Sequence, residues 1–169
     1  IKKTNAVNAP IDLTETSVRI AQKENTVYNQ YFARLLRNFN SNLAAVTTDG
    51  LGQAIRDTKV PAFATLGDYD QLFVAPLSGF KDAWDYYKQC STVDRLGAIR
   101  SPVTLLTAKD DPIIPYQIYL KKKLNPNFHF RLENTGGHLG YLSKTKTPLN
   151  SNRWMDWYLI EHIEETFRK

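Results

Sequence analysis

Hydrophobic and polar positions along the chain follow two different periods, which predicts strands separated by helices. Residues 103–107 form a short run of apolar and β-branched side chains between a proline and an acidic turn, a pattern typical of a strand buried on both faces. Residues 128–132 alternate between apolar and polar and predict a second strand. A third short strand is expected around Ala6 and Val7.

Most of the remaining chain has the spacing of helices. Asp12 and Glu15 have the spacing of a capping box, which predicts a helix over residues 13–23. Between residues 26 and 39 aromatic and aliphatic side chains recur every three or four positions, as in an amphipathic helix. Such a stripe is typical of a core; the alternative is a lid whose aromatic face borders a substrate pocket. Further helices are expected over residues 81–90, 116–124 and 153–167, with Asn152 as a cap, and loops over residues 47–52 and 67–70.

Strands that alternate with helices predict an α/β fold with a parallel sheet. Three strands are too few to close such a core, and the sequence begins with Ile1 instead of methionine, so we expect a fragment. The expected organisation is a single partial domain over residues 1–169. Within it, a helical lid insertion occupies approximately residues 12–78, and residues 100–169 hold the last two strands and the final helix.

Composition and charge exclude several classes of protein. Hydrophobic residues at 42% and aromatic residues at 12% fit a globular fold. The net charge of +5 is dispersed apart from Lys121–Lys123, which is typical of a solvated helix end, so we expect no nucleic-acid partner. The single cysteine, Cys90, cannot form an internal disulfide, and no apolar run approaches the roughly 20 residues of a membrane span. We therefore expect a cytoplasmic protein.

The candidate chemistry follows the two central strands. Acidic residues at 110–111 follow one strand, and His138 follows the next on a loop opened by two glycines. Because the carboxyl ends of parallel strands meet at one edge of a sheet, an aspartate and this histidine can form two thirds of a triad in the order Ser, Asp, His. The histidine would take the proton of a serine hydroxyl, and the carboxylate would fix the imidazole tautomer.

A second arrangement of the same side chains is a metal site. Asp110, Asp111, His129 and His138 include the ligand types that transition metals prefer. The acid–base pair already accounts for the aspartates and one histidine, so we expect no metal and no cofactor. His129 and His162 are then an ordinary strand residue and a helix-surface residue.

Three motifs together resemble the YheT-like branch of the α/β-hydrolase superfamily. They are Gly-Phe-Lys-Asp-Ala-Trp-Asp-Tyr-Tyr-Lys-Gln-Cys-Ser around Phe80, Ala-Lys-Asp-Asp-Pro from Ala108, and Gly-Gly-His-Leu-Gly-Tyr from Gly136. Residues 7–13 and 28–39 are similar to the end of the sixth sheet strand and to the lid helices of that branch. The resemblance implies the carboxyl-terminal half of an α/β-hydrolase fold, with parallel strands, helices and a helical lid insertion.

The resemblance also implies a role for each candidate residue. In the superfamily's Gly-x-x-Asp turn the acid stands three positions after the glycine, and Ala108 occupies the glycine position here. This favours Asp111 over Asp110 as the triad acid, with His138 as the general base. We expect Asp110 to cap the following helix instead.

The sequence departs from the superfamily pattern at the nucleophile. No Gly-x-Ser-x-Gly occurs in the 169 residues, so we expect the serine to lie outside this segment, which alone is inactive. The expected function is a serine hydrolase of carboxylic or lipid esters. Its substrate would be a small-molecule ester with an apolar acyl chain, and the missing amino-terminal half of the same protein would complete it. The alternative is a catalytically inactive α/β-hydrolase-like fragment that acts as a protein interaction module and self-associates through exposed strand edges.

Overall fold

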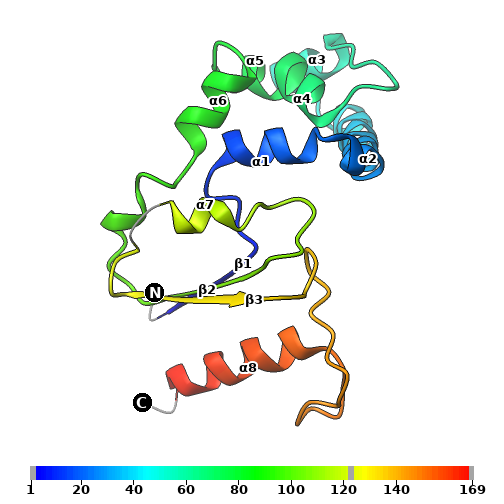
Figure 1. Cartoon of the computed structure of the whole chain (residues 1–169). Helices are drawn as coiled ribbons and strands as arrows, with labels where there is room; N and C mark the ends of the chain where they lie inside the picture. The colour runs from blue at the N-terminus through cyan, green and yellow to red at the C-terminus, as the bar shows by residue number, and fades with distance from the viewer. Residues whose placement is uncertain (1–2, 122–123, 168–169) are drawn as a thin grey trace. The chain divides into compact units, whose positions relative to one another are not determined.

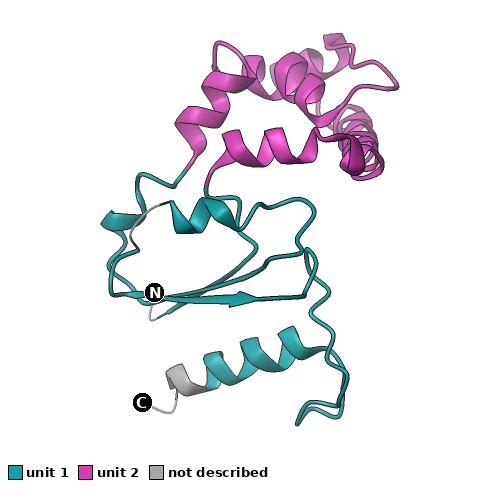
Figure 2. Ribbon diagram, in the orientation of Figure 1, with its two compact units in different colours: residues 1–11, 92–169 teal, residues 12–91 magenta. Residues whose placement is uncertain are grey.

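The computed structural model describes residues 3–121 and 124–167, except the side chains of residues 165–167. Lys122 and Lys123 of the expected basic run therefore lie outside the described residues. The chain forms two compact units (Figure 2). Residues 1–11 and 92–169 form the first unit, and residues 12–91 form the second, which is entirely helical in its regular structure.

The first unit is built on a parallel sheet of three strands in the order β1 (Thr4–Val7), β2 (Val103–Ala108), β3 (Phe128–Glu133). The central strand β2 pairs with β1 from Val103 to Leu106 and with β3 along its whole length. All six residues of β2 are buried, as expected for a strand covered on both faces. The predicted α/β class with a parallel sheet is confirmed.

Helices α7 (Gln117–Leu120) and α8 (Trp154–Phe167) lie on opposite faces of this sheet (Figure 1). On the α8 face, Leu106 and Ala108 of β2 are fully buried in a cluster with aromatic side chains. The guanidinium of Arg131 lies 4.8 Å from the centre of the Trp154 ring, which adds a cation–π contact to this packing. The cluster consists of Leu106, Ala108, Tyr141 and Tyr158, with Val7, Trp154, Met155, Trp157 and Leu159 packed against it.

The final helix begins two residues after the asparagine expected to cap it. The Nδ2 group of Asn152 donates a hydrogen bond of 2.8 Å to the carbonyl of Ser143, and the Ser143 amide donates to the Asn152 carbonyl at 2.9 Å. Asn152 therefore closes the loop that precedes α8, and the prediction of a cap at this position is wrong. The short 3₁₀ turn η3 (Leu96–Ala98) precedes β2 in the same unit.

The second unit contains short helical elements around one long helix. The carboxylate of Asp12 accepts from the Glu15 amide at 3.1 Å and caps the first of them. Within the described residues, no helix of the chain is long and apolar enough to cross a membrane. The elements are α1 (Leu13–Ile20), η1 (Lys23–Asn25), α2 (Thr26–Val46), α3 (Gly50–Asp57), α4 (Leu66–Tyr69), the π-helical turn η2 (Asp70–Val74), α5 (Ala75–Leu77) and α6 (Ala83–Cys90).

The loop expected over residues 67–70 is instead helical. Thr65 and Asp68 form a reciprocal capping box, in which the Asp68 carboxylate accepts from the Thr65 amide at 2.9 Å. The cap satisfies amides at the start of α4, so the helix forms although it contains Gly67. In the same way, Asp49 caps α3, which begins at Gly50 inside the loop expected over residues 47–52.

The aromatic stripe of α2 is not core in the described unit. The buried positions of this helix are Asn29, Ala33 and Asn40, whereas Val27 and Phe39 on the stripe are 79% and 61% exposed. Hydrogen bonds compensate for burying the asparagines: Asn29 Oδ1 accepts from the Leu66 amide at 2.6 Å, and the Asn40 amide group donates to the Tyr69 hydroxyl. The prediction of a core stripe is wrong for this unit. That the helical segment acts as a lid stays a prediction.

Replacement of Leu106 by alanine tests the importance of the core on the α8 face. The side chain is fully buried, so we expect the free energy of unfolding to fall by about 2–5 kcal/mol through lost burial and a residual cavity. Urea denaturation followed by circular dichroism measures the loss. The matched control is Leu149→Ala, at a position 47% exposed, where we expect a change within about 0.5 kcal/mol. Equal losses in both variants would contradict this description of the core.

Candidate active site

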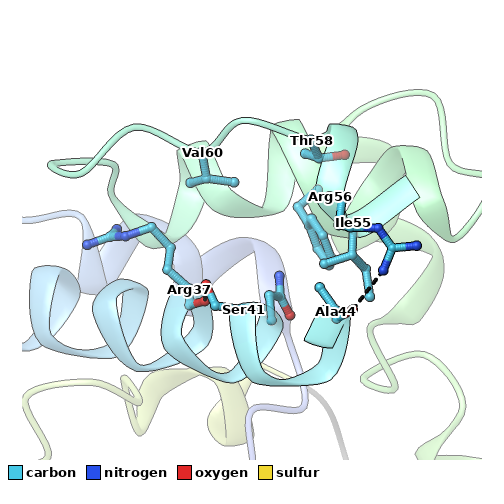
Figure 3. Close-up of a pocket in the computed structure, with 9 residues that line it drawn as sticks. Arg37, Ser41, Ala44, Ile55, Arg56, Thr58 and Val60 are labelled. Atoms are coloured by element: carbon cyan, nitrogen blue, oxygen red, sulfur yellow. Dashed lines mark hydrogen bonds between the residues drawn. The ribbon is translucent and has the colours of Figure 1, made fainter. Parts of the chain in front are cut away.

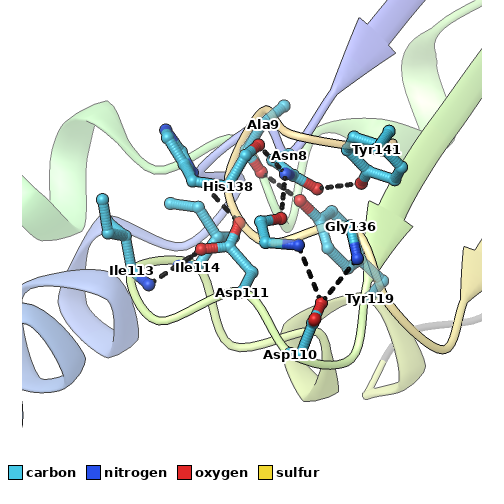
Figure 4. A network of polar contacts seen from close by, with 11 residues as sticks. Asn8, Ala9, Asp110, Asp111, Ile113, Ile114, Tyr119, Gly136, His138 and Tyr141 are labelled. Carbon is cyan, nitrogen blue, oxygen red and sulfur yellow. Dashed lines mark hydrogen bonds and ion pairs between the residues drawn. The ribbon is translucent and has the colours of Figure 1, made fainter. Parts of the chain in front are cut away.

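The candidate site lies where β2 and β3 end. Ala108 and Glu133 are register partners at the last position of the two strands, and the Lys109 amide donates to the Glu133 carbonyl at 2.9 Å. The turns that follow the two strands therefore start side by side (Figure 4). One turn carries Asp110 and Asp111, and the other carries His138.

Asp111 and His138 form a hydrogen-bonded pair. The Nδ1 atom of His138 lies 3.0 Å from Oδ2 of Asp111. The other carboxylate oxygen accepts from the amides of Ile113 and Ile114 at 2.8 and 3.0 Å. A carboxylate only accepts, so Nδ1 carries the proton in this pair, and in the neutral imidazole the lone pair is then on Nε2. This is the arrangement that a general base requires.

The two members of the pair differ in their exposure to solvent. The side chain of Asp111 is completely buried, and that of His138 is 35% exposed. Burying a carboxylate is costly unless its oxygens are hydrogen-bonded, and the imidazole together with two main-chain amides meets this need. The carboxylate is thus fixed, while the imidazole remains open to a further reactant.

Asp110 holds the turn that carries the histidine. Its Oδ1 atom accepts from the amides of Gly136 and Gly137, both at 2.8 Å. The expectation that Asp110 caps the following helix is therefore wrong. The reason is distance along the chain, because Pro112 and Pro115 delay the next helix until Gln117.

Two glycines are required for this turn. Gly137 has a φ of 56°, which an L side chain rarely adopts. A Cβ atom on Gly136 would lie 2.5 Å from the ring of Tyr141, closer than real contacts allow. The glycines therefore allow the turn to pack directly on a buried aromatic ring.

Asn8, directly after β1, is a site residue that the sequence pattern did not reveal. It is 2% exposed and has a φ of 44°, in the left-handed region that asparagine tolerates better than most residues. Its Nδ2 group donates to the carbonyls of Gly137, at 3.2 Å, and His138, and its Oδ1 accepts from the Tyr141 hydroxyl at 2.8 Å. An asparagine at the end of a strand was the only available signal in the sequence.

Two buried tyrosines complete the polar surroundings. Burial raises the pKa of Tyr141 well above its ordinary value, and the nearby negative charge of Asp111 adds to the effect. Burial likewise raises the pKa of Tyr119, whose hydroxyl donates to the Ala9 carbonyl at 2.6 Å. Both phenols therefore stay protonated at neutral pH and act as hydrogen-bond donors.

The structure does not bring together the four residues of the metal-site alternative. His129 is the second residue of β3 and pairs with Thr104, so it lies at the opposite end of the strand from the turn with His138. Its ring instead stacks near that of His162, with 6.1 Å between centroids. Within the described residues, no group of three or more His, Cys, Asp or Glu side chains is placed to hold a metal.

The helical unit contains a separate cavity of about 340 Å³ (Figure 3). The guanidinium of Arg56 in its wall donates to the carbonyls of Ala44, at 2.7 Å, and Thr47, at the end of α2. None of the lining side chains is a carboxylate, histidine or cysteine, so this cavity offers no acid–base chemistry. Its lining consists of Arg37, Asn40, Ser41, Ala44, Ile55, Arg56, Thr58, Val60 and Phe73.

Comparison with known proteins gives clear relatives among curated sequences. The Escherichia coli protein named "Putative esterase YheT" is 30% identical over 151 residues, which cover 89% of this chain and 43% of that protein. An "Abhydrolase domain-containing protein" of Dictyostelium discoideum is 27% identical over 94% of this chain and 39% of its own length. A "Monoacylglycerol lipase" of Saccharomyces cerevisiae is 31% identical over 63% of this chain and 24% of its own length.

The parallel sheet, the turns at its carboxyl edge and these relatives place the chain in the α/β-hydrolase superfamily. Within it, the chain belongs to the YheT-like branch, as its motifs predicted. The chain spans less than half the length of each of these relatives. No protein-family model matches the chain, and no solved structure matches it.

Replacement of Gly136 by alanine tests the packing of the histidine turn. The added methyl group would collide with the Tyr141 ring, so we expect the free energy of unfolding to fall by about 1–3 kcal/mol, as in overpacked cores. Urea denaturation measures the change. In the control, Gly97→Ala, nothing lies within 4 Å of the new Cβ atom, and we expect a change within about 0.5 kcal/mol. A Gly136→Ala variant as stable as the control would disprove the close contact.

Proposed function

We propose that the protein containing this chain is a serine hydrolase that cleaves carboxylic or lipid esters. Asp111 is the triad acid, His138 is the general base, and the nucleophilic serine comes from residues outside this chain, in an amino-terminal half of the same protein. The observation that carries the proposal is the 3.0 Å contact between His138 Nδ1 and Asp111 Oδ2 at the carboxyl edge of a parallel sheet. The curated relatives support this proposal, because the name of one describes an esterase and the name of another describes a lipase.

In the proposed reaction, Nε2 of His138 takes the proton of the serine hydroxyl while the serine oxygen attacks the ester carbonyl. The resulting imidazolium is stabilised by the Asp111 carboxylate. It returns the proton to the alcohol oxygen as the carbon–oxygen bond breaks, which leaves an acyl-enzyme. A water molecule then repeats the cycle, releases the acid and restores the serine.

The surroundings of Asp111 suit this role. The imidazolium gains from a nearby negative charge that cannot turn away, and two amides hold the carboxylate in one orientation. The side chain of His138 is 35% exposed, so part of the ring is accessible to a serine and a substrate. The pair therefore needs only a hydroxyl within hydrogen-bonding distance of Nε2.

An apolar acyl chain is the substrate group that we propose. Helix α2 exposes an apolar stripe in the helical unit, and side chains of this kind favour contact with hydrocarbon over water. Among the relatives, the name monoacylglycerol lipase describes an enzyme for lipid esters. The exposed members of the stripe are Val27, Tyr28, Tyr31, Leu35 and Phe39.

Labelling with a fluorophosphonate tests the triad in the full-length protein. We expect the wild type to react covalently and His138→Ala to lose the labelling, because no base remains to activate the serine. Asp111→Asn should lower kcat for a p-nitrophenyl ester by about 10,000-fold, since the amide stabilises the wrong tautomer. His129→Gln is the matched control and should keep full labelling, because this residue lies at the other end of β3.

Full labelling of the His138→Ala variant would remove the assignment of the base. A folded wild type that never reacts with the probe would remove the enzymatic proposal altogether. The alternative of an inactive module would then follow, and sedimentation would determine whether the protein self-associates.

A further inference from the structure

The turn that presents His138 is held by side chains that follow two other strands. From the geometry of these contacts we propose that Asn8 is a positioning residue, whose amide group fixes the orientation of the His138 imidazole toward Asp111. The importance of this role for catalysis rests on the proposed hydrolase function. The role of Asn8 in orienting the imidazole does not. Asn8 touches neither a reacting atom nor the imidazole, and acts through the main chain of the turn.

Asn8 connects the turn to the sheet. Its own amide donates to the Leu106 carbonyl at 2.9 Å, so its backbone continues the register between β1 and β2. Its side chain donates to the carbonyl of His138 itself and to that of the residue before it. These bonds connect the main chain of the histidine directly to the edge of the sheet.

Asp110 holds the same turn from the other side. It accepts from the amides of Gly136 and Gly137, while Asn8 donates to the carbonyls of Gly137 and His138. Three consecutive residues thus have their main chain fixed by two side chains of opposite hydrogen-bonding character. The turn cannot rotate without breaking bonds to both, and a rotation is the motion that would swing the imidazole away from Asp111.

Only asparagine meets every requirement at position 8. The φ of 44° disfavours most side chains other than glycine, asparagine, aspartate and histidine, and a neutral histidine has only one donor for the two carbonyls. Aspartate could accept from Tyr141 but could not donate to two carbonyls, and glycine offers no side chain. The Tyr141 hydroxyl bonds Oδ1 and so determines which end of the amide faces the carbonyls. Tyr141 therefore supports Asn8 in the same role.

Kinetics of the full-length protein test the proposal, with p-nitrophenyl butyrate as substrate. Asn8→Gly keeps the backbone conformation accessible and removes the side chain. We expect kcat to fall on the order of 100-fold, the cost of a reacting group displaced by about 1 Å, with KM unchanged. We expect kcat of Asn8→Asp to fall by the same factor. Tyr141→Phe removes one hydroxyl, and we expect its kcat to fall about tenfold. Asn150→Gly is the matched control, because Asn150 also has a positive φ, of 55°, but its side chain accepts from Lys146 in the loop before α8.

Nuclear magnetic resonance gives a readout that does not depend on activity. With ¹⁵N-labelled histidine, the proton on Nδ1 of His138 should give a protected downfield signal that Asp111→Asn abolishes. We expect Asn8→Gly and Asn8→Asp to lose this signal and Asn150→Gly to keep it. The signals of His129 and His162 report whether each variant is folded. If Asn8→Gly does not fold, Tyr141→Phe is tested in the same way and should show a weakened signal.

The two readouts separate the possible failures. Wild-type kcat in the Asn8 variants, or an unchanged Nδ1 signal, would overturn the positioning role, and so would a lower kcat with the signal intact. A wild-type protein with no esterase activity would remove the proposed function alone. Loss of the signal in the Asn8 variants would then still support the role of Asn8 in orienting the imidazole.

Discussion

The parallel register of three strands is the constraint on which the candidate site depends. It places the ends of β1, β2 and β3 at one edge of the sheet, so Asn8, the two aspartates and the histidine turn meet although they are far apart in sequence. A shift of β3 by one residue would exchange its faces and separate Ala108 from Glu133. The hydrophobic packing of β2 on both faces holds the register, so the core and the site are stabilised by the same contacts.

Buried polar groups give this edge its rigidity. Asp111 and Asn8 are almost inaccessible to solvent, and each would be costly to bury without partners. Asp111 instead accepts from main-chain amides of its own turn, and Asn8 donates to main-chain carbonyls of the histidine turn; these main-chain groups lie outside any helix or strand. The cost of losing these bonds restricts the turns to one arrangement, which is the condition that precise proton transfer requires.

The sequence predicted the sheet and the central pair because these depend on local patterns. A buried apolar run followed by an aspartate, and an alternating run followed by glycines and a histidine, place Asp111 and His138 at strand ends whatever surrounds them. Asn8 and the role of Asp110 could not be predicted, since their partners are main-chain atoms of a distant turn. Two predictions were wrong because polar contacts outweighed the local pattern. In α2, asparagines occupy buried positions in place of the hydrophobic stripe. At residues 67–70, a capping box starts a helix although a glycine is present.

The contact between Asn8 and His138 spans 130 positions of the chain, which sets when it can form during synthesis. At about 5–20 residues per second, a ribosome needs on the order of ten seconds to add the residues between them. For most of that time β1 has no β2 to pair with, and for all of it the turn that Asn8 binds is missing. The geometry of the candidate acid–base pair is therefore a late product of translation, and a nascent chain stopped before His138 would lack one of its two members.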